Sequence, residues 1–385
     1  MMPGRLNEEK GIILPIVLIL TLILMITGLV FVSLGVQENR LVQREIKKRQ
    51  AFYLAEAGVE TAIWQFNYGD QPWLPSWSAP WTEDGDGNPT RTETLYDAQS
   101  SSVGDYEVTV FDKDSSYPEI KSIGYVPSKG AEGRIEKTVH VILEKGHDPM
   151  FDYAIASAAG IIIESPGTEI TGSCYAVGNI RIQEAIVNGN AVATESVINT
   201  GTVTGTITEG ADELPFPKFD SDYYQYKANS IINGDLAING VDPYIVDGIL
   251  YVTGNVTIRN SALVGPGSIV AEGKIKIGEN SVFGTGSDTG VSLVSAYESG
   301  LEEDIAVKIE EGIPENPSQI WGVLWSPNGR IKIEMYAKLY GSAVSGGTHK
   351  IETGSGVIDY TQFDDEDFYS YAARPVYRVT DWAEE

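Results

Sequence analysis

The chain has few of the residues that form disulfides or bind transition metals. Its 385 residues include one cysteine, Cys174, and three histidines. A single cysteine excludes a disulfide within the chain and a cysteine-rich zinc site. His140, His147 and His349 do not have the spacing of zinc ligands. The nucleophile elbow, the P-loop and the dinucleotide-binding glycine motif are also absent from the sequence. We therefore expect no enzymatic activity, and we expect Cys174 to be a small buried residue.

Basic residues are also scarce. Lys and Arg number 27 against 54 Asp and Glu, which gives a formal net charge of −27. A nucleic-acid partner is not expected, because such proteins need a basic face that displaces counterions. Apolar residues at 42% and aromatic residues at 10% are sufficient for hydrophobic cores, so global disorder is excluded. At about 150 residues per domain, the length predicts two or three domains.

One segment lacks charge altogether. Residues 11–37 contain no Asp, Glu, Lys or Arg, and the apolar run over residues 12–36 is long enough to cross a bilayer core of about 30 Å as a helix. We predict one helix over residues 12–66, which spans a membrane first and is amphipathic afterwards. The alternative is a signal anchor followed by an unrelated helix. The apolar residues that continue at helical spacing are Leu41, Ile46, Phe52, Ala55, Val59, Ala62, Ile63 and Phe66.

A short hydrophilic leader, residues 1–11, precedes the apolar run and ends in Gly11, directly before Ile12. Residues 49–62 read RQAFYLAEAGVETA. The leader resembles that of type IV prepilins, and residues 49–62 resemble the N-terminal signature of PilX-type minor pilins. The resemblance covers residues 1–66. It implies that a prepilin peptidase cleaves after Gly11, that the mature protein begins at Ile12, and that other pilin subunits are partners.

Two features do not follow directly from the prepilin resemblance. Major pilins carry Glu at mature position five, where this chain has Ile16. The difference implies a tip or initiating subunit, or a protein that never polymerises. The second feature is a basic cluster after the apolar run, which the positive-inside rule assigns to the cytoplasm. The resemblance implies instead that the bulk of the chain is extracytoplasmic, on the cell surface or in a pilus, and we adopt that orientation. The cluster consists of Arg40, Arg44, Lys47, Lys48 and Arg49.

Residues 67–149 are predicted to form a pilin-like β headgroup. Prolines and tryptophans make residues 67–103 rich in loops. Alternating apolar residues predict strands over 105–111, 119–126 and 134–143, joined by turns as an antiparallel meander. A sheet of this kind would cover the amphipathic half of the long helix.

Asp84, Asp86 and Asn88 have the spacing of the first ligands of a calcium loop. Oxygen ligands at alternate positions suit a hard cation. However, the closing acid expected eleven residues after Asp84 falls on Leu95. The alternative is an ordinary surface turn. Calcium is the one candidate cofactor, and no other is expected.

The C-terminal half contains a short repeat of glycine, a polar residue and an apolar-any-apolar triplet. Successive glycines lie 18, 56, 20, 19 and 56 residues apart, so a unit of about 19 residues fits each interval, with three units in each interval of 56. Short strands with one turn per unit predict a parallel β-solenoid over residues 150–362, with a β-sandwich as the alternative. The same half resembles the β-repeat domains that follow PilX-type N-termini. The repeat glycines are Gly178, Gly234, Gly254, Gly273 and Gly329, and Gly160 begins a degenerate copy of the unit.

Three segments fall outside this repeat. Residues 209–229 are predicted to pack outside the coils as a loop and a short helix, and residues 301–319 to form a second interruption. Residues 363–385 are predicted to form an acidic tail. The fold class is therefore mainly β with one long N-terminal helix, a pilin-like meander and a parallel solenoid.

The predicted function is that of a membrane-anchored minor pilin-like structural subunit that displays a solenoid outside the cell, at the tip of a type IV pilus or pseudopilus. The alternative is a non-polymerising membrane-anchored adhesin or a scaffold that binds surface polysaccharide. Exposed aromatic rings could stack on sugars, whereas buried rings would be ordinary core residues. The aromatic residues considered are Tyr223, Tyr224, Trp321, Trp325 and Tyr336.

Overall fold

The computed structural model describes most of the chain in two compact units. The helix–sheet unit comprises residues 1–68, 75–143 and 379–385, and the coil unit comprises residues 69–74 and 144–378. A long N-terminal helix and many strands, both antiparallel and parallel, confirm the predicted fold class. The described residues are 13–69, 74, 77–164, 166–284, 286, 289–298, 304–310, 312, 315, 317–334, 336–346, 350–354, 356–360 and 375–384.

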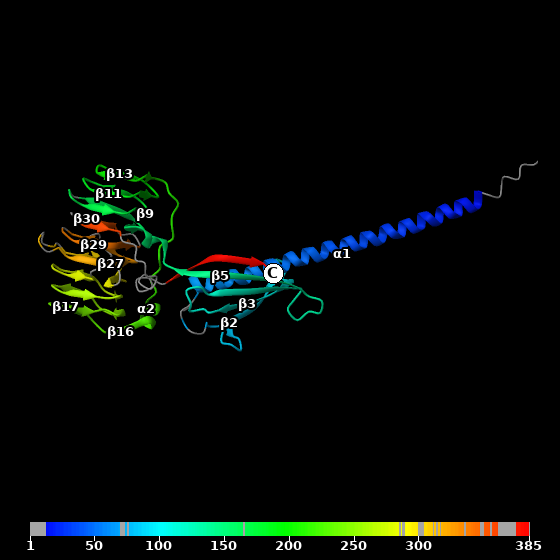
Figure 1. Cartoon of the computed structure of the whole chain (residues 1–385), viewed down its shortest axis with the longest axis horizontal. Helices are drawn as coiled ribbons and strands as arrows, with labels where there is room; N and C mark the ends of the chain where they lie inside the picture. The colour runs from blue at the N-terminus through cyan, green and yellow to red at the C-terminus, as the bar shows by residue number, and fades with distance from the viewer. Residues whose placement is uncertain are drawn as a thin grey trace, which may run out of the picture. The chain divides into compact units, whose positions relative to one another are not determined.

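Helix α1 (Ile13–Tyr68) is continuous over 56 residues (Figure 1). Its side chains are exposed through most of the first half, and regular burial starts at Ala51. The hydroxyls of Thr21 and Thr27 donate to backbone carbonyls one turn earlier, at 2.6 and 2.9 Å. These two hydroxyls are therefore satisfied within the helix, which suits a lipid environment.

The helix–sheet unit contains a six-stranded sheet with the order β1-β2-β3-β4-β5-β32. Strands β1 to β5 pair antiparallel with their neighbours in sequence, as the predicted meander requires. Two parts of the sheet differ from the sequence prediction. Strands β1 and β2 lie within the predicted loop region 67–103, and β32 occupies most of the second half of the predicted acidic tail 363–385. The strands are β1 (Thr82–Glu83), β2 (Pro89–Tyr96), β3 (Ser102–Phe111), β4 (Glu119–Val126), β5 (Ile135–Gly146) and β32 (Val376–Glu384).

Small residues let the second half of α1 lie directly on β3 and β4. Ala51 and Ala55 are fully buried. A Cβ atom at Gly124 of β4 would overlap the carbonyl oxygen of Ala51, and one at Gly58 of the helix would overlap the hydroxyl of Ser122. The residues that resemble the PilX signature thus form a stripe along which the helix backbone contacts the sheet.

The coil unit is built from short parallel strands that stack in two sheets, of nine and 17 strands. A 3₁₀ helix, η1 (Pro149–Asp152), precedes them. The nine-stranded sheet contains β7 (Gly160–Glu164), β10 (Ile180–Ile182), β13 (Val197–Asn199), β17 (Leu236–Asn239), β20 (Val256–Arg259), β23 (Ile275–Ile277), β26 (Ile305–Ile309), β28 (Arg330–Ile333) and β30 (Lys350–Gly354).

The 17-stranded sheet contributes one or two strands to each coil. Its members are β6 (Ile155–Ser157), β8 (Glu169–Thr171), β9 (Cys174–Ala176), β11 (Ile186–Asn188), β12 (Ala191–Ala193), β14 (Thr202–Val203), β15 (Ile207–Thr208), β16 (Ala228–Ile232), β18 (Tyr244–Ile245), β19 (Gly248–Val252), β21 (Ala262–Val264), β22 (Gly267–Ala271), β24 (Val282–Phe283), β25 (Val291–Ser295), β27 (Gln319–Ser326), β29 (Lys338–Ser345) and β31 (Val357–Asp359).

The strand register gives the length of each coil. Val256 pairs with Ile275, so this coil has the predicted 19 residues. Ile275 pairs with Val307, and Val307 with Ile331, so the next two coils have 32 and 24 residues. The interval of 56 residues after Gly273 therefore holds two long coils, and the prediction of three short ones is wrong. The predicted interruption at residues 301–319 is also wrong in part, because β26 lies inside it.

The coils are not stacked in sequence order. The chain first forms the coils of β7, β10 and β13, which lie towards one end of the stack. Residues 209–227 then lead to the other end, and the later coils, starting with that of β17, stack from there back towards β7. Figure 1 shows β13 and β17 at opposite ends of this unit. The last coil closes on the first, because Lys350 of β30 pairs with Gly160 of β7. The interval between Gly178 and Gly234 thus contains this crossing rather than three coils.

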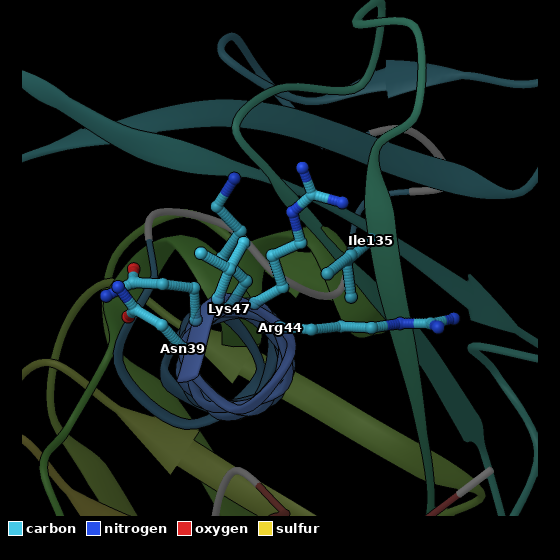
Figure 2. A pocket seen from close by; sticks show the side chains of 7 residues that line it. Asn39, Arg44, Lys47 and Ile135 are labelled. Carbon is cyan, nitrogen blue, oxygen red and sulfur yellow. The ribbon is translucent and has the colours of Figure 1, made fainter. Parts of the chain in front are cut away.

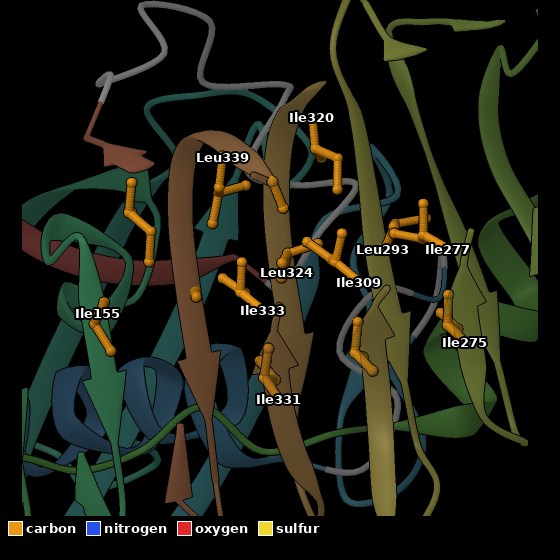
Figure 3. Packing of buried hydrophobic residues seen from close by; sticks show 14 of the residues in the cluster. Ile155, Ile275, Ile277, Leu293, Ile309, Ile320, Leu324, Ile331, Ile333 and Leu339 are labelled. Carbon is orange, nitrogen blue, oxygen red and sulfur yellow. The ribbon is translucent and has the colours of Figure 1, made fainter. Parts of the chain in front are cut away.

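Isoleucine ladders fill the interior of the coils. Along the nine-stranded sheet, Ile238, Ile258, Ile277, Ile309 and Ile333 pair in register from strand to strand. All five are at most 2% exposed. Figure 3 shows that such residues from successive strands point into one core. Inward apolar positions therefore alternate with outward positions that are polar in most of these strands, as in β10, β20, β23 and β28, since side chains along a strand alternate between its two faces.

Candidate functional site

The apolar half of α1 is the first functional element. The helix is long and apolar enough to cross a membrane, and no part of its most apolar 18-residue window is buried in the structure. A signal sequence near the N-terminus would satisfy the same test of length and composition. One exposed apolar helix at the N-terminus fits membrane anchoring, because water would otherwise contact these side chains.

The predicted processing site lies outside the described residues, because Gly11 and Ile12 precede the first one. Ile16 is described and lies on α1, where its side chain is 55% exposed. Cleavage after Gly11 therefore stays a prediction. The position of Ile16 shows only that its side chain is available to a neighbouring molecule or to lipid.

A basic pocket lies on α1 just beyond the apolar run (Figure 2). Its volume is about 440 Å³, and its lining includes Val36, Arg40, Arg44 and Lys47 of the helix and Ile135 at the start of β5. The four helical residues are spaced by four, four and three positions, so they share one face of the helix. The sequence showed these basic residues only as a signal for orientation. The contribution of Ile135 could not be found without the fold.

The basic residues of this region differ in their partners. Lys48 and Arg49 both contact Glu45, at 3.7 and 3.9 Å. Arg40 and Arg44 form no ion pair with any residue that the structure describes. An anion could therefore approach these two guanidinium groups without displacing an acidic side chain.

Asp84, Asp86 and Asn88 come together in the turn between β1 and β2. Oδ1 of Asp84 accepts from the backbone N–H groups of Asp86 and Asn88, at 2.9 and 2.8 Å, and its Oδ2 accepts from Nδ2 of Asn88 at 3.1 Å. The hydrogen bonds from Asn88 lower the pKa of Asp84. The side chain of Asn88 thus presents its amide nitrogen to Asp84. The three residues form a surface turn here, and in this conformation their oxygens do not form a set of cation ligands.

Three of the five aromatic residues considered above are buried. Tyr223, Tyr224 and Trp325 are at most 5% exposed, and they pack with Phe219 outside the coil interior. Phe219 stacks on Tyr224 with ring centroids 5.0 Å apart. Helix α2 (Ser221–Lys227) carries both tyrosines, so residues 209–229 form the predicted loop and short helix outside the coils. These rings belong to the core and are not available to sugars.

Two aromatic residues keep some contact with solvent. Trp321 of β27 is half-buried and stacks on Tyr340 of the neighbouring strand, with ring centroids 4.4 Å apart and an interplanar angle of 13°. One face of each ring is therefore covered by the other ring. Tyr336 is 37% exposed in the turn before β29. The sequence did not single out Tyr340, whose role depends on the register between β27 and β29.

The nucleophilic and metal-binding side chains are dispersed. Cys174 is fully buried, which raises its thiol pKa to about 12. His140 lies 3.1 Å from Glu119, and His147 lies 2.7 Å from Asp152, each as a separate pair. Within the part of the chain that the structure describes, no three His, Cys, Asp or Glu side chains could hold one metal ion. His349 lies outside the described residues.

Comparisons with known proteins give only distant likenesses. No family model and no curated protein matches the chain. Among solved structures, the competence-associated pilin ComZ from Thermus thermophilus is similar at 15% identity and a TM-score of 0.39, over 88% of this chain and 98% of that chain. An ice-binding protein from an Antarctic biological consortium is similar at 11% identity and a TM-score of 0.35, over 54% of this chain and 87% of that chain. An ice-binding protein from the Antarctic ascomycete Antarctomyces psychrotrophicus is similar at 12% identity and a TM-score of 0.31, over 56% of this chain and 99% of that chain. At TM-scores below 0.5, these likenesses carry no argument about function.

Proposed function

We propose that this chain is a PilX-type minor pilin-like subunit, held in a membrane by the first half of α1 and displaying a parallel β-solenoid on the outside of the cell. The observation that carries the proposal is the division of α1 into two halves. Its first half has exposed apolar side chains, and its second half is buried on an antiparallel sheet through Ala51, Ala55 and Gly58. A helix built in this way serves both as an anchor and as the spine of a headgroup.

Processing by a prepilin peptidase tests the proposal. Co-expressed with such an enzyme, the chain is expected to lose residues 1–11 and to begin at Ile12. The Gly11→Val variant is expected to stay intact, because a branched side chain crowds the scissile bond. Intact-mass spectrometry measures both outcomes. An unprocessed wild-type chain in the presence of an active peptidase would refute the prepilin assignment.

The position in a filament is a separate part of the proposal. Ile16 has no carboxylate to neutralise the N-terminal amine of a neighbouring subunit, so we place the protein at a filament tip or at the start of assembly. Immunogold labelling is then expected at filament ends or in the membrane. Labelling along the whole filament would contradict this placement.

The alternative function is a non-polymerising adhesin or polysaccharide-binding scaffold. Burial of Tyr224 and Trp325 removes most of the aromatic surface on which that function would depend. Trp321 and Tyr340 are the remaining stacked pair, and the exposed parts of their rings could contact a sugar. A Trp321→Ala variant that loses binding to a surface polysaccharide, while its melting temperature is unchanged, would favour this alternative.

We further propose that the chain carries out no catalysis. The support, within the described residues, is that His140 and His147 contact different carboxylates and that Cys174 is buried. Calcium binding at Asp84 also stays a proposal, and it would require the amide of Asn88 to turn its oxygen towards the ion. Isothermal titration of the full chain with calcium, compared with an Asp84→Asn variant, would measure it.

A further inference from the structure

Positive charge is concentrated around the basic pocket on α1, whereas the chain as a whole is strongly acidic. Residues 40–49 contain five of the 27 Lys and Arg residues and one acidic residue, in a chain with a formal net charge of −27. Within this group, Arg40, Arg44 and Lys47 face the same pocket, which Ile135 closes from the side of the sheet. Figure 2 shows that the side chains of Arg44 and Lys47 leave the helix on the side where Ile135 lies.

The depth of the pocket in a membrane follows from helix geometry. At about 1.5 Å per residue, Arg40 lies roughly 6 Å beyond Val36, the last residue of the apolar run, and Lys47 lies roughly 16 Å beyond it. The headgroup layer extends about 5 to 8 Å on each side of the hydrocarbon core. Helical side chains lean towards the N-terminus, and long Lys and Arg stems extend their charges further in that direction. The positive charges of Arg40 and Arg44 therefore reach back to the headgroup layer, and Lys47 lies at its outer side.

The lining of the pocket changes in polarity along the same direction. Val36 is apolar and lies nearest the bilayer core, whereas Arg40, Arg44 and Lys47 follow at increasing distance. Guanidinium groups bind phosphate through paired N–H donors, and an ammonium group adds a point charge. A phospholipid has the matching order, with acyl chains first and phosphate next.

From this match we propose that the pocket binds the headgroup of an anionic phospholipid, with the phosphate between Arg40 and Arg44 and an acyl chain along Val36. The inference depends on the membrane anchoring proposed above. It also accounts for the basic cluster that follows the apolar run, because the positive charges bind lipid on the outer side of the membrane rather than keeping this part of the chain in the cytoplasm.

Native mass spectrometry of the full chain in detergent tests the proposal, with equimolar phosphatidylglycerol and phosphatidylcholine added. The wild-type chain is expected to retain phosphatidylglycerol in preference to phosphatidylcholine. The R40Q/R44Q variant is expected to lose that preference by about fivefold per cation, or on the order of 25-fold in all, because one basic residue near an anionic surface contributes about 1 kcal/mol. The K48Q/R49Q variant is the matched control, since it removes the same charge about two turns further along the helix and changes no residue that lines the pocket.

Several results would overturn the inference. Equal retention of the two lipids by the wild type, or equal losses in the two variants, would exclude a headgroup site in this pocket. Displacement of phosphatidylglycerol by an equal concentration of inorganic phosphate would show a general anion site. Loss of crosslinking between copies in R40Q/R44Q, with lipid retention unchanged, would assign the pocket to a second copy of the chain. Flotation of the chain with neutral phosphatidylcholine vesicles tests membrane anchoring alone. A chain that does not float lacks the proposed anchor, whereas a chain that floats but shows no lipid preference lacks only the headgroup site.

Discussion

Ile258 and Thr257 are neighbours on β20, and they differ in burial. Ile258 is fully buried between Ile238 and Ile277 of the adjacent strands, whereas Thr257 is half-buried on the outer side, where it pairs with Lys276. Truncation of a buried isoleucine costs about 2 to 5 kcal/mol. An aspartate at the same place must also stay protonated or carry a desolvated charge, and a shift of about 3 pKa units corresponds to roughly 4 kcal/mol.

We therefore expect Ile258→Asp to lower the free energy of unfolding of the coil unit by about 5 kcal/mol or more, a large part of the roughly 5 to 15 kcal/mol of a typical domain. Thr257→Asp is expected to change it by about 0.5 kcal/mol or less, as surface substitutions usually do. Because each coil is stabilised by its neighbours, the loss of unfolding free energy should lower the stability of the whole stack.

Cys174 provides the assay. It is the single cysteine of the chain, it is fully buried, and it lies in β9 of the coil unit, far along the stack from β20. The urea concentration at which its thiol becomes reactive in the full chain reports unfolding of this unit alone. Ile258→Asp should lower that concentration strongly, and Thr257→Asp should leave it unchanged. Equal shifts in the two variants would refute the assignment of inward and outward positions. No shift in either would show that the coils do not unfold together.

Two further predictions concern close packing and pH. Gly124→Val should destabilise the helix–sheet unit by about 1 to 3 kcal/mol, because the new side chain overlaps the carbonyl of Ala51, whereas Gly130→Val, which meets no atom within 4 Å, should melt like the wild type. For Glu334, burial is the largest single influence and would raise the carboxyl pKa, but the hydrogen bonds and charges of Lys308 and Lys332, 3.0 and 3.3 Å away, together outweigh it and the pKa is lowered from 4.5. The stabilisation from Glu334 is thus complete above pH 4.5 and is lost as the pH falls through the lowered pKa of the folded chain. Glu334→Gln should cost about 1 kcal/mol or less at pH 7, and urea titrations of the two proteins should converge in acid. A difference that persists at low pH would exclude these ion pairs as its cause.

The sequence predicts the elements whose burial is periodic. Helix α1 follows from an uninterrupted apolar run and a helical pattern, and the strand predicted over 119–126 coincides with β4 because alternate residues there face the helix. Strand β2 has little apolar patterning, since it reads PTRTETLY and its first residue is its only buried one. Strand β32 is mostly exposed at the edge of the sheet. Both are specified by pairing with a neighbouring strand, which local periodicity does not record.

The candidate site required the fold for a similar reason. The spacing of Arg40, Arg44 and Lys47 is visible in the sequence, but the pocket exists only because Ile135 lies against the same face of the helix. The aromatic residues needed the fold as well. The sequence left open whether Trp325 and Tyr224 are exposed, and both are buried because residues 209–229, which include Tyr224, pack over Trp325.

One row of outward-facing side chains on the 17-stranded sheet is covered by another part of the chain. Strands of this face, such as β19 and β22, are buried at every residue, unlike β20 or β23, where burial alternates. Continuous burial means that the outward side chains also need a cover. The sequence carries this signal as short runs of mainly small and apolar residues, among them GILYV and GSIVA. The row consists of Val192, Tyr175, Ala156, Val344, Trp325, Val294, Val270 and Tyr251, each in register with the next.

The same row explains why the coils are not stacked in sequence order. Every coil presents similar isoleucines to its neighbours, so the repeat itself permits one coil to stack on any other. The crossing segment is more specific, because Tyr175 donates to the carbonyl of Asp212 and accepts from the N–H of Leu214, and Phe219 packs against Trp325 further along the row. A segment fixed at these points must lead from the coil of β15 to the far end of the stack, where β16 begins. The order of the coils is therefore determined by residues 209–229, which interrupt the repeat, and not by the repeat.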